Sequence, residues 1–85
     1  MITFTVFQKQ KKGGAFKSEI KCFTSINKAR DFASPIVAEM RKKAQDSSYE
    51  LKSYIDGMSY DDKSEGTMLQ EIGLIENDSN SINVF

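Results

Sequence analysis

The feature that most constrains the fold of this 85-residue chain is a Gly-Gly pair that separates two stretches of alternating residues. Residues 2–7 and 15–23 each alternate with a period of two, which is the period of a half-buried β-strand. Gly13 and Gly14 supply the freedom at positive φ that a tight reversal requires. The sequence therefore predicts an antiparallel hairpin at the start of the chain.

Alternation also predicts which side chains share a face of this hairpin. In residues 2–7 the apolar even positions would form one face, with Ile2, Phe4 and Val6. In residues 15–23 we expect Cys22 to be a small buried hydrophobe beside Phe16 and Ile20. The face away from Val6 is expected to combine aromatic and basic side chains, namely Phe7, Phe23, Lys17 and Lys21.

Residues 23–45 show the three- and four-residue spacing of an amphipathic helix. Thr24 or Ser25 can cap its start. Pro35 predicts a bend or a break, because its ring nitrogen cannot donate a backbone hydrogen bond. The apolar face continues in phase across Pro35, which favours one bent helix over two helices with Ser34 as the second cap. That face consists of Ala29, Phe32, Ala33, Ile36, Val37, Met40 and Ala44.

The second half of the chain is less regular. Residues 49–56 alternate and predict a third strand, which a turn at Asp56-Gly57 would end. Residues 58–66 show no periodicity and predict a polar loop. Residues 67–76 fit a short helix or a strand, because a short apolar run does not decide between the two.

The last residues, 80–85, are strand-like and could return to a sheet edge. Together the elements predict one α+β domain over residues 1–85, with a basic ββα half (1–45) and an acidic strand and loop half (46–85). Its small antiparallel sheet would contain the N-terminal hairpin and the later strands. One amphipathic helix, kinked at Pro35, would cover one face of that sheet.

The formal net charge of zero conceals an uneven distribution. Residues 1–45 hold ten Lys or Arg and three Asp or Glu, a balance of +7, whereas residues 46–85 hold two and nine, a balance of −7. Such asymmetry is typical of a chain with a charged partner. The two halves would instead neutralise each other if they fold together.

The residue types present exclude most enzyme chemistry. The chain has no histidine and one cysteine, so the usual general base and an internal disulfide are both missing. Asp56, Asp61, Asp62 and Glu65 do not have the spacing of an EF-hand loop. Gly13-Gly14 lacks the following Lys-Ser/Thr of a phosphate-binding loop. We expect no enzymatic activity, no cofactor and no metal.

The N-terminal residues lack the basic lead and apolar run of a signal peptide, and no apolar stretch is long enough to span a membrane. We therefore expect a cytoplasmic protein with no membrane contact, in the host cytoplasm if a phage encodes it. The lysine- and serine-rich composition is that of small accessory proteins of phages and mobile elements. We expect a non-enzymatic regulator that binds and inhibits a host factor, such as a defence nuclease or a toxin.

Two alternative functions follow from the same charges. Lysines interleaved with aromatic residues suit the phosphates and bases of RNA or of another single-stranded nucleic acid. Charge asymmetry would also allow a self-assembling structural subunit, and therefore a homo-oligomer. The candidate residues for binding a nucleic acid or a partner are Lys9, Lys11, Lys12, Lys17, Lys21, Phe7, Phe23, Arg41, Lys42 and Lys43.

Overall fold

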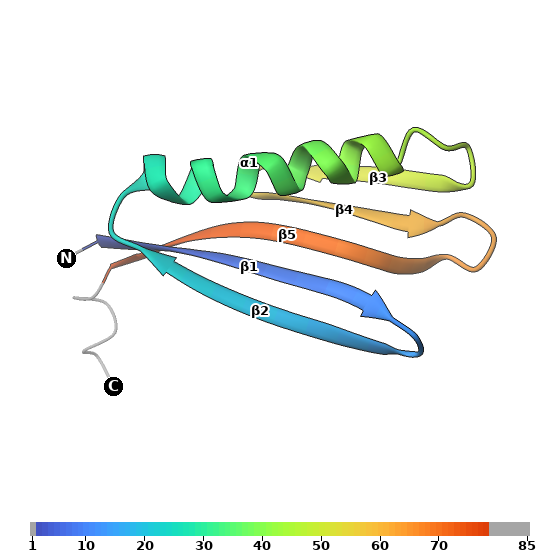
Figure 1. The fold of residues 1–85 in the computed structure, drawn as a ribbon, viewed down its shortest axis with the longest axis horizontal. Coiled ribbons are helices and arrows are strands. Elements are labelled where there is room, and N and C mark those ends of the chain that lie inside the picture. The colour runs from blue at the N-terminus through green and yellow to red at the C-terminus, as the bar shows by residue number, and fades with distance from the viewer. Residues whose placement is uncertain (1, 79–85) are drawn as a thin grey trace.

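The computed structural model describes residues 2–78, which form a five-stranded antiparallel sheet with one helix on one of its faces (Figure 1). The spatial order of the strands is β2-β1-β5-β4-β3. This arrangement confirms the α+β class that the sequence predicts. The elements are β1 (Ile2–Lys12), β2 (Ala15–Phe23), α1 (Ile26–Lys43), β3 (Tyr49–Tyr54), β4 (Gly57–Asp62) and β5 (Thr67–Asp78).

The predicted hairpin is present, but the predicted composition of its faces is wrong. A two-residue turn at Gly13 and Gly14 joins β1 to β2, so that odd residues of β1 lie opposite even residues of β2. Phe7 therefore pairs with Ile20. Residues directly opposite each other in an antiparallel pair point to the same face. The face that carries Val6 therefore also carries Lys17, Lys21 and Phe23, and these do not accompany Phe7.

Helix α1 begins where the sequence predicts a cap. Ser25 is the N-cap, and its side-chain oxygen accepts a hydrogen bond from the backbone N–H of Lys28. The helix continues through Pro35 as one element, which confirms the single helix over the alternative of two. The hydroxyl of Ser34 donates to the backbone oxygen of Arg30, so it does not cap a second helix.

The core lies between α1 and the face of the sheet that α1 covers. Phe23 of β2 packs against Phe32 of α1 with ring centroids 5.5 Å apart, and the rings of Tyr49 and Tyr60 meet edge to face at 5.7 Å. The first contact joins α1 to the sheet, and the second joins β3 to β4. The buried apolar residues in the described part of the chain are Val6, Ala29, Met40, Met58, Tyr60 and Ile72.

The predicted polar loop at residues 58–66 is wrong, because most of it is strand β4. β4 pairs with β3 on one side and with β5 on the other, so it lies inside the sheet and is buried from Met58 to Asp61. Its polar residues are compatible with burial because two of them, Ser59 and Asp61, bond to side chains of β3.

The structure also decides the segment that the sequence left open. Residues 67–76 are part of β5, which pairs with both β1 and β4, so the strand alternative is confirmed and the helix is wrong. The predicted strand at residues 80–85 lies outside the described residues. Over residues 2–78, no helix is both long and apolar enough to cross a membrane.

Candidate binding surfaces

Helix α1 covers one face of the sheet and leaves the other face uncovered within residues 2–78. We call the face covered by α1, together with α1 itself, the helix side, and the opposite face the open side. Among the elements described for residues 2–78, none packs on the open side. Because alternation assigns each strand residue to one face, the register places the candidate residues on these two sides.

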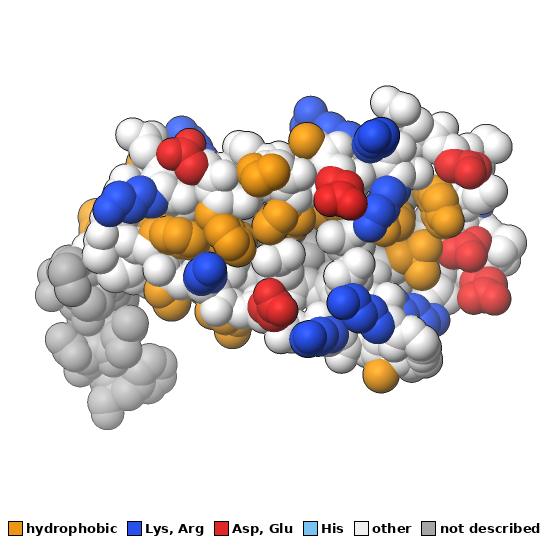
Figure 2. Space-filling view, in the orientation of Figure 1, with side chains coloured by type: hydrophobic (Ala, Val, Ile, Leu, Met, Phe, Trp, Pro, Cys, Tyr) orange, Lys and Arg blue, Asp and Glu red, His pale blue; other side chains and the backbone are white. Residues whose placement is uncertain are grey.

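Most basic residues belong to the helix side. Eight of the twelve Lys and Arg residues lie there, three on the first hairpin and five on α1. Figure 2 shows Lys and Arg side chains along α1 and near the tip of the β1–β2 hairpin, whereas several acidic side chains gather at the end of the molecule where β4 turns into β5. The eight residues are Lys12, Lys17, Lys21, Lys28, Arg30, Arg41, Lys42 and Lys43.

A groove runs beside α1 on the helix side. We call it the basic groove and define it by Arg30, Ala33, Val37 and Arg41 of α1 and by residues 53–57 at the β3–β4 turn. It encloses about 310 Å³ and continues as a shallower hollow of about 590 Å³ along the helix, which Lys42 also lines. Arg30 and Arg41 are three turns apart, so they lie on one stripe of α1.

The floor of the basic groove is apolar. Met58, Ile72 and Leu74 of the sheet lie between the helix and the β3–β4 turn. Arginines at the rim of an apolar floor can pair with carboxylates or phosphates while the floor accepts an apolar side chain. No local sequence pattern indicates this groove, although the helical spacing of Arg30 and Arg41 is visible in the sequence.

On the open side, five residues that pair in succession form a row across all five strands. The ring of Phe7 lies on Gly73, where a Cβ atom would overlap the ring. A hollow of about 570 Å³ remains between Phe7, Tyr54 and Ile75, with Gly57 in its floor. In order from β2 to β3, the row consists of Ile20, Phe7, Gly73, Gly57 and Tyr54.

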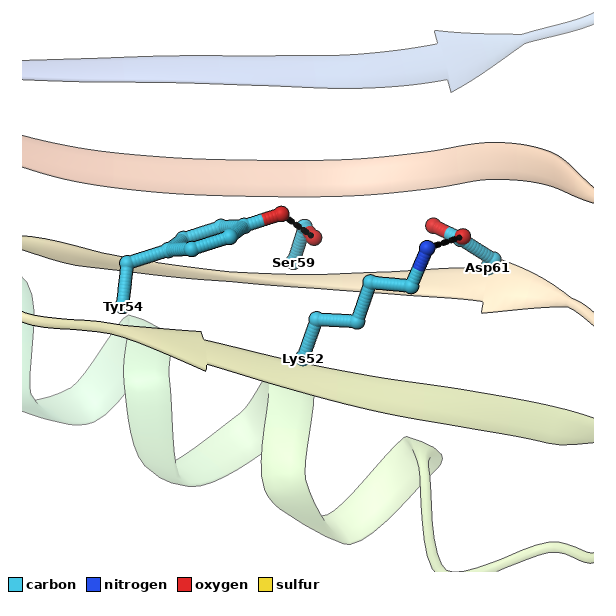
Figure 3. A network of polar contacts seen from close by, with 4 residues as sticks. All are labelled: Lys52, Tyr54, Ser59 and Asp61. Carbon is cyan, nitrogen blue, oxygen red and sulfur yellow. Dashed lines mark hydrogen bonds and ion pairs between the residues drawn. The ribbon is translucent and has the colours of Figure 1, made fainter.

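The next row of the open side is polar and is shown in Figure 3, in which α1 lies behind the strands. The Tyr54 hydroxyl and the Ser59 hydroxyl are 3.0 Å apart, and Lys52 Nζ lies 2.9 Å from a carboxylate oxygen of Asp61. The hydrogen bond with Asp61 raises the pKa of Lys52 above its ordinary value. The side chains of β3 thus cover the polar residues of β4.

The predicted combination of lysines and aromatic rings is divided between the two sides. On the open side, Lys9 Nζ lies 5.5 Å from the ring centroid of Phe16. On the helix side, Lys21 Nζ lies 4.9 Å from that of Phe32, a ring that already packs against Phe23. Each pair is a cation–π contact within the chain. The structure therefore separates Phe7, Lys9 and Lys11 from the other predicted binding residues.

The expected burial of Cys22 is wrong. Cys22 is exposed on the open side near the edge of the sheet, where its sulfur lies 3.6 Å from the hydroxyl oxygen of Thr5. The two-residue hairpin turn explains the difference, because it turns Cys22 away from α1.

The acidic residues do not form a site within the described chain. Asp61 pairs with Lys52, and Asp62 accepts hydrogen bonds from the hydroxyl and the backbone N–H of Ser64. These bonds lower the pKa of Asp62 below its ordinary value. Over residues 2–78, no three Cys, Asp or Glu side chains are grouped closely enough to hold a metal ion.

Comparisons with known proteins do not assign a function to the basic groove or to the open side. A scan against protein-family models, a search of curated proteins and a search of solved structures each found no match to this chain.

Proposed function

We propose that this chain is a small non-enzymatic protein that binds an acidic surface of a protein partner through the basic groove. The observation that carries the proposal is the position of Arg30 and Arg41 at either end of one stripe of α1, above an apolar floor. Arginine is enriched among the residues that dominate protein interfaces, because its planar head forms two hydrogen bonds to a carboxylate.

Charge on the rest of the helix side supports the same partner. The excess of Lys and Arg there would attract an acidic surface during encounter and increase the association rate. The apolar floor would then accept a side chain of the partner, as the centre of a protein interface does. A protein partner uses both features, whereas phosphates alone would use only the charges.

The specific form of the proposal is inhibition of a host factor by a phage or mobile-element accessory protein. The composition of the chain supports this form, and its lack of histidine supports an action by occupation rather than by chemistry. An inhibitor of this kind would cover a functional surface of a nuclease or a toxin.

Affinity capture from a nuclease-treated bacterial lysate tests the proposal. The wild-type chain should retain a stoichiometric protein band, and Arg41→Glu and Arg30→Glu should each reduce it at least tenfold. Lys63→Glu is the matched control, because it makes the same charge change on an exposed residue in the β4–β5 turn. Capture that is equal for Arg41→Glu and Lys63→Glu, or that is absent for the wild type, would contradict the proposal.

Single-stranded RNA is the second candidate partner, because eight basic residues on one side also suit phosphates. The separation of exposed aromatic rings from these residues makes base stacking beside them difficult. A titration with labelled single-stranded RNA at low and physiological salt distinguishes the candidates. Binding that weakens steeply with salt and is lost in Arg41→Glu would favour RNA over a protein partner.

A further inference from the structure

We infer that the open side packs against the open side of a second copy of this chain, which forms a symmetric dimer with both helices on the outside. This inference concerns the open side, which adjoins the basic groove at the β3–β4 turn, and it does not depend on the proposed function. It begins from the apolar residues that the fold leaves exposed.

Four of the seven large hydrophobic residues that are exposed lie on the open side. Ile20 is the most exposed of the four, at 72%, and it lies in the row with Phe7 and Tyr54. Monomeric domains rarely expose several large apolar side chains on one face, and such faces often mark interaction sites. The four residues are Phe16, Ile20, Tyr54 and Ile75.

The shape of the open side is complementary to itself. β5 is the central strand, so a two-fold axis parallel to the strands and above β5 places β1 over β4 of the second copy, and β2 over β3. At the register of the glycine row, Phe7 of each copy then faces Gly57 of the other, where the hollow lies. Sheets that pack face to face in this aligned way lie about 10 Å apart, with interdigitated side chains.

The same axis brings the most exposed of these four residues onto an aromatic ring. Ile20 at the β2 end of the row faces Tyr54 at the β3 end of the other copy, and the contact occurs twice. Each large side chain in the row thus meets a glycine or a partner of different shape. Gly73, at the centre of the row, faces Gly73 of the second copy. The absence of side chains there leaves room for the Phe7 rings on either side.

One pair of opposite charges, Lys11 and Asp61, meets under this axis, whereas Glu71 of β5 faces Glu71 of the other copy, with Lys9 beside it at the same register. Gln10 of β1 and Tyr60 of β4 both pair with Gln70 of β5, so they lie at the same height along the strands. Lys11 and Asp61 each follow by one residue, and Lys11 of one copy therefore faces Asp61 of the other. Asp61 already pairs with Lys52 within its own chain and would be shared between two cations. A rotation about an axis perpendicular to the strands lacks this match, because Lys11 would then face the uncharged end of the open side.

The area of the open side suffices for a stable dimer. Five strands spaced at about 4.8 Å, with their lengths at about 3.4 Å per residue, give about 700 Å² of sheet plane per copy. Two copies therefore cover about 1,400 Å², and projecting side chains add to this value. Specific stable interfaces begin at about 1,200 Å². The dimer would leave both basic grooves facing outward, so that one dimer could bind two partner surfaces.

Light scattering or sedimentation of the purified chain tests the dimer. The wild type should approach twice the 9.6 kDa chain mass as concentration rises from micromolar to near-millimolar. Ile20→Glu should stay monomeric over that range, with its circular dichroism and melting unchanged at low concentration. Leu51→Glu is the matched control, because Leu51 is an exposed residue of the other edge strand on the helix side, and it should dimerise as the wild type does.

A thiol crosslinker tests the position of the axis. In a Cys22→Ser background, Ile75→Cys places one cysteine on the central strand, where the two copies meet at the axis, so a short bis-maleimide should link them. Ile20→Cys places its cysteines four strand spacings apart, about 19 Å, and should remain unlinked. A wild-type chain of monomer mass at all concentrations, an Ile20→Glu variant that dimerises normally, or crosslinking of Ile20→Cys but not Ile75→Cys would each overturn the inference.

Discussion

The helix side and the open side are the two faces of the same strands, but apolar side chains are buried on the first and exposed on the second. On the helix side, residues such as Met40 and Val6 are removed from water by contacts within the chain. On the open side, Ile20 and Phe16 remain exposed, although they come from an equally regular strand. Within residues 2–78 the sheet has an intrachain partner on only one face, so the other face is available for binding.

The largest expected effect distinguishes these two kinds of burial. Met40→Ala removes most of a fully buried side chain and should lower the free energy of unfolding by about 2–5 kcal/mol at any protein concentration. Ile20→Ala should cost less than about 0.5 kcal/mol at low concentration, since surface substitutions rarely exceed that value. Urea unfolding at two concentrations measures both. A similar loss for the two variants at low concentration would remove the distinction.

A second prediction concerns the close approach of strands on the open side. Gly73→Ala should cost about 1–3 kcal/mol, because the new methyl group would overlap the ring of Phe7. Phe7→Leu in the same chain should recover part of the loss by vacating that space. The free energies of unfolding of the wild type, the two single variants and the double variant form a double-mutant cycle that measures this recovery. Strict additivity would show that Phe7 does not lie on Gly73.

A smaller effect is expected from the polar row. Tyr54→Phe removes a hydroxyl that bonds to Ser59, whose side chain is only 1% exposed, and should cost about 1 kcal/mol. In the Ser59→Ala background, the same substitution should cost much less, because no buried hydroxyl is left unpaired. Equal costs in both backgrounds would contradict the bond that Figure 3 shows.

The smallest effect is a loss of stability at alkaline pH. Burial raises the pKa of Tyr60, with a further contribution from Tyr49 and Glu39, and the bond to Asp61 raises the pKa of Lys52. Both groups hold their protons in the folded chain at a pH where the unfolded chain releases them. Stability should therefore fall as pH rises above about 10.

Urea midpoints between neutral pH and that range measure this fall. Tyr60→Phe should show a shallower decrease than the wild type, because it cannot ionise. A wild-type midpoint that does not change with pH would contradict the assignment of these two groups.

The sequence predicts the elements better than it predicts their faces. The periodicity of residues 15–23 and the cap at Ser25 lead directly to β2 and to the start of α1. The assignment of Phe23 and Cys22 to faces depends on turn length, and a difference of one residue exchanges the two faces. Only the observed two-residue turn decides between them.

The other errors also have a physical cause in tertiary structure. Residues 58–61 of β4 alternate between apolar and polar, but the run is short and continues into a polar turn, so only the pairing of β3 and β5 with both of its edges identifies it as a strand. The basic groove depends on where α1 lies relative to the β3–β4 turn, which no local pattern specifies. Interactions between distant segments therefore determine the parts of the candidate surfaces that the sequence left undecided.

The central claim is that Phe7, Ile20 and Tyr54 form a face that meets its own copy, whereas Phe23 and Phe32 meet within one chain. Isotope-filtered nuclear Overhauser measurements on a mixture of labelled and unlabelled chains test it directly. The account predicts intermolecular contacts between the Ile20 methyl groups and the Tyr54 ring, and only intramolecular contacts between Phe23 and Phe32. Intermolecular contacts at Phe23, or a contact between Ile20 and Phe32 within one chain, would contradict it.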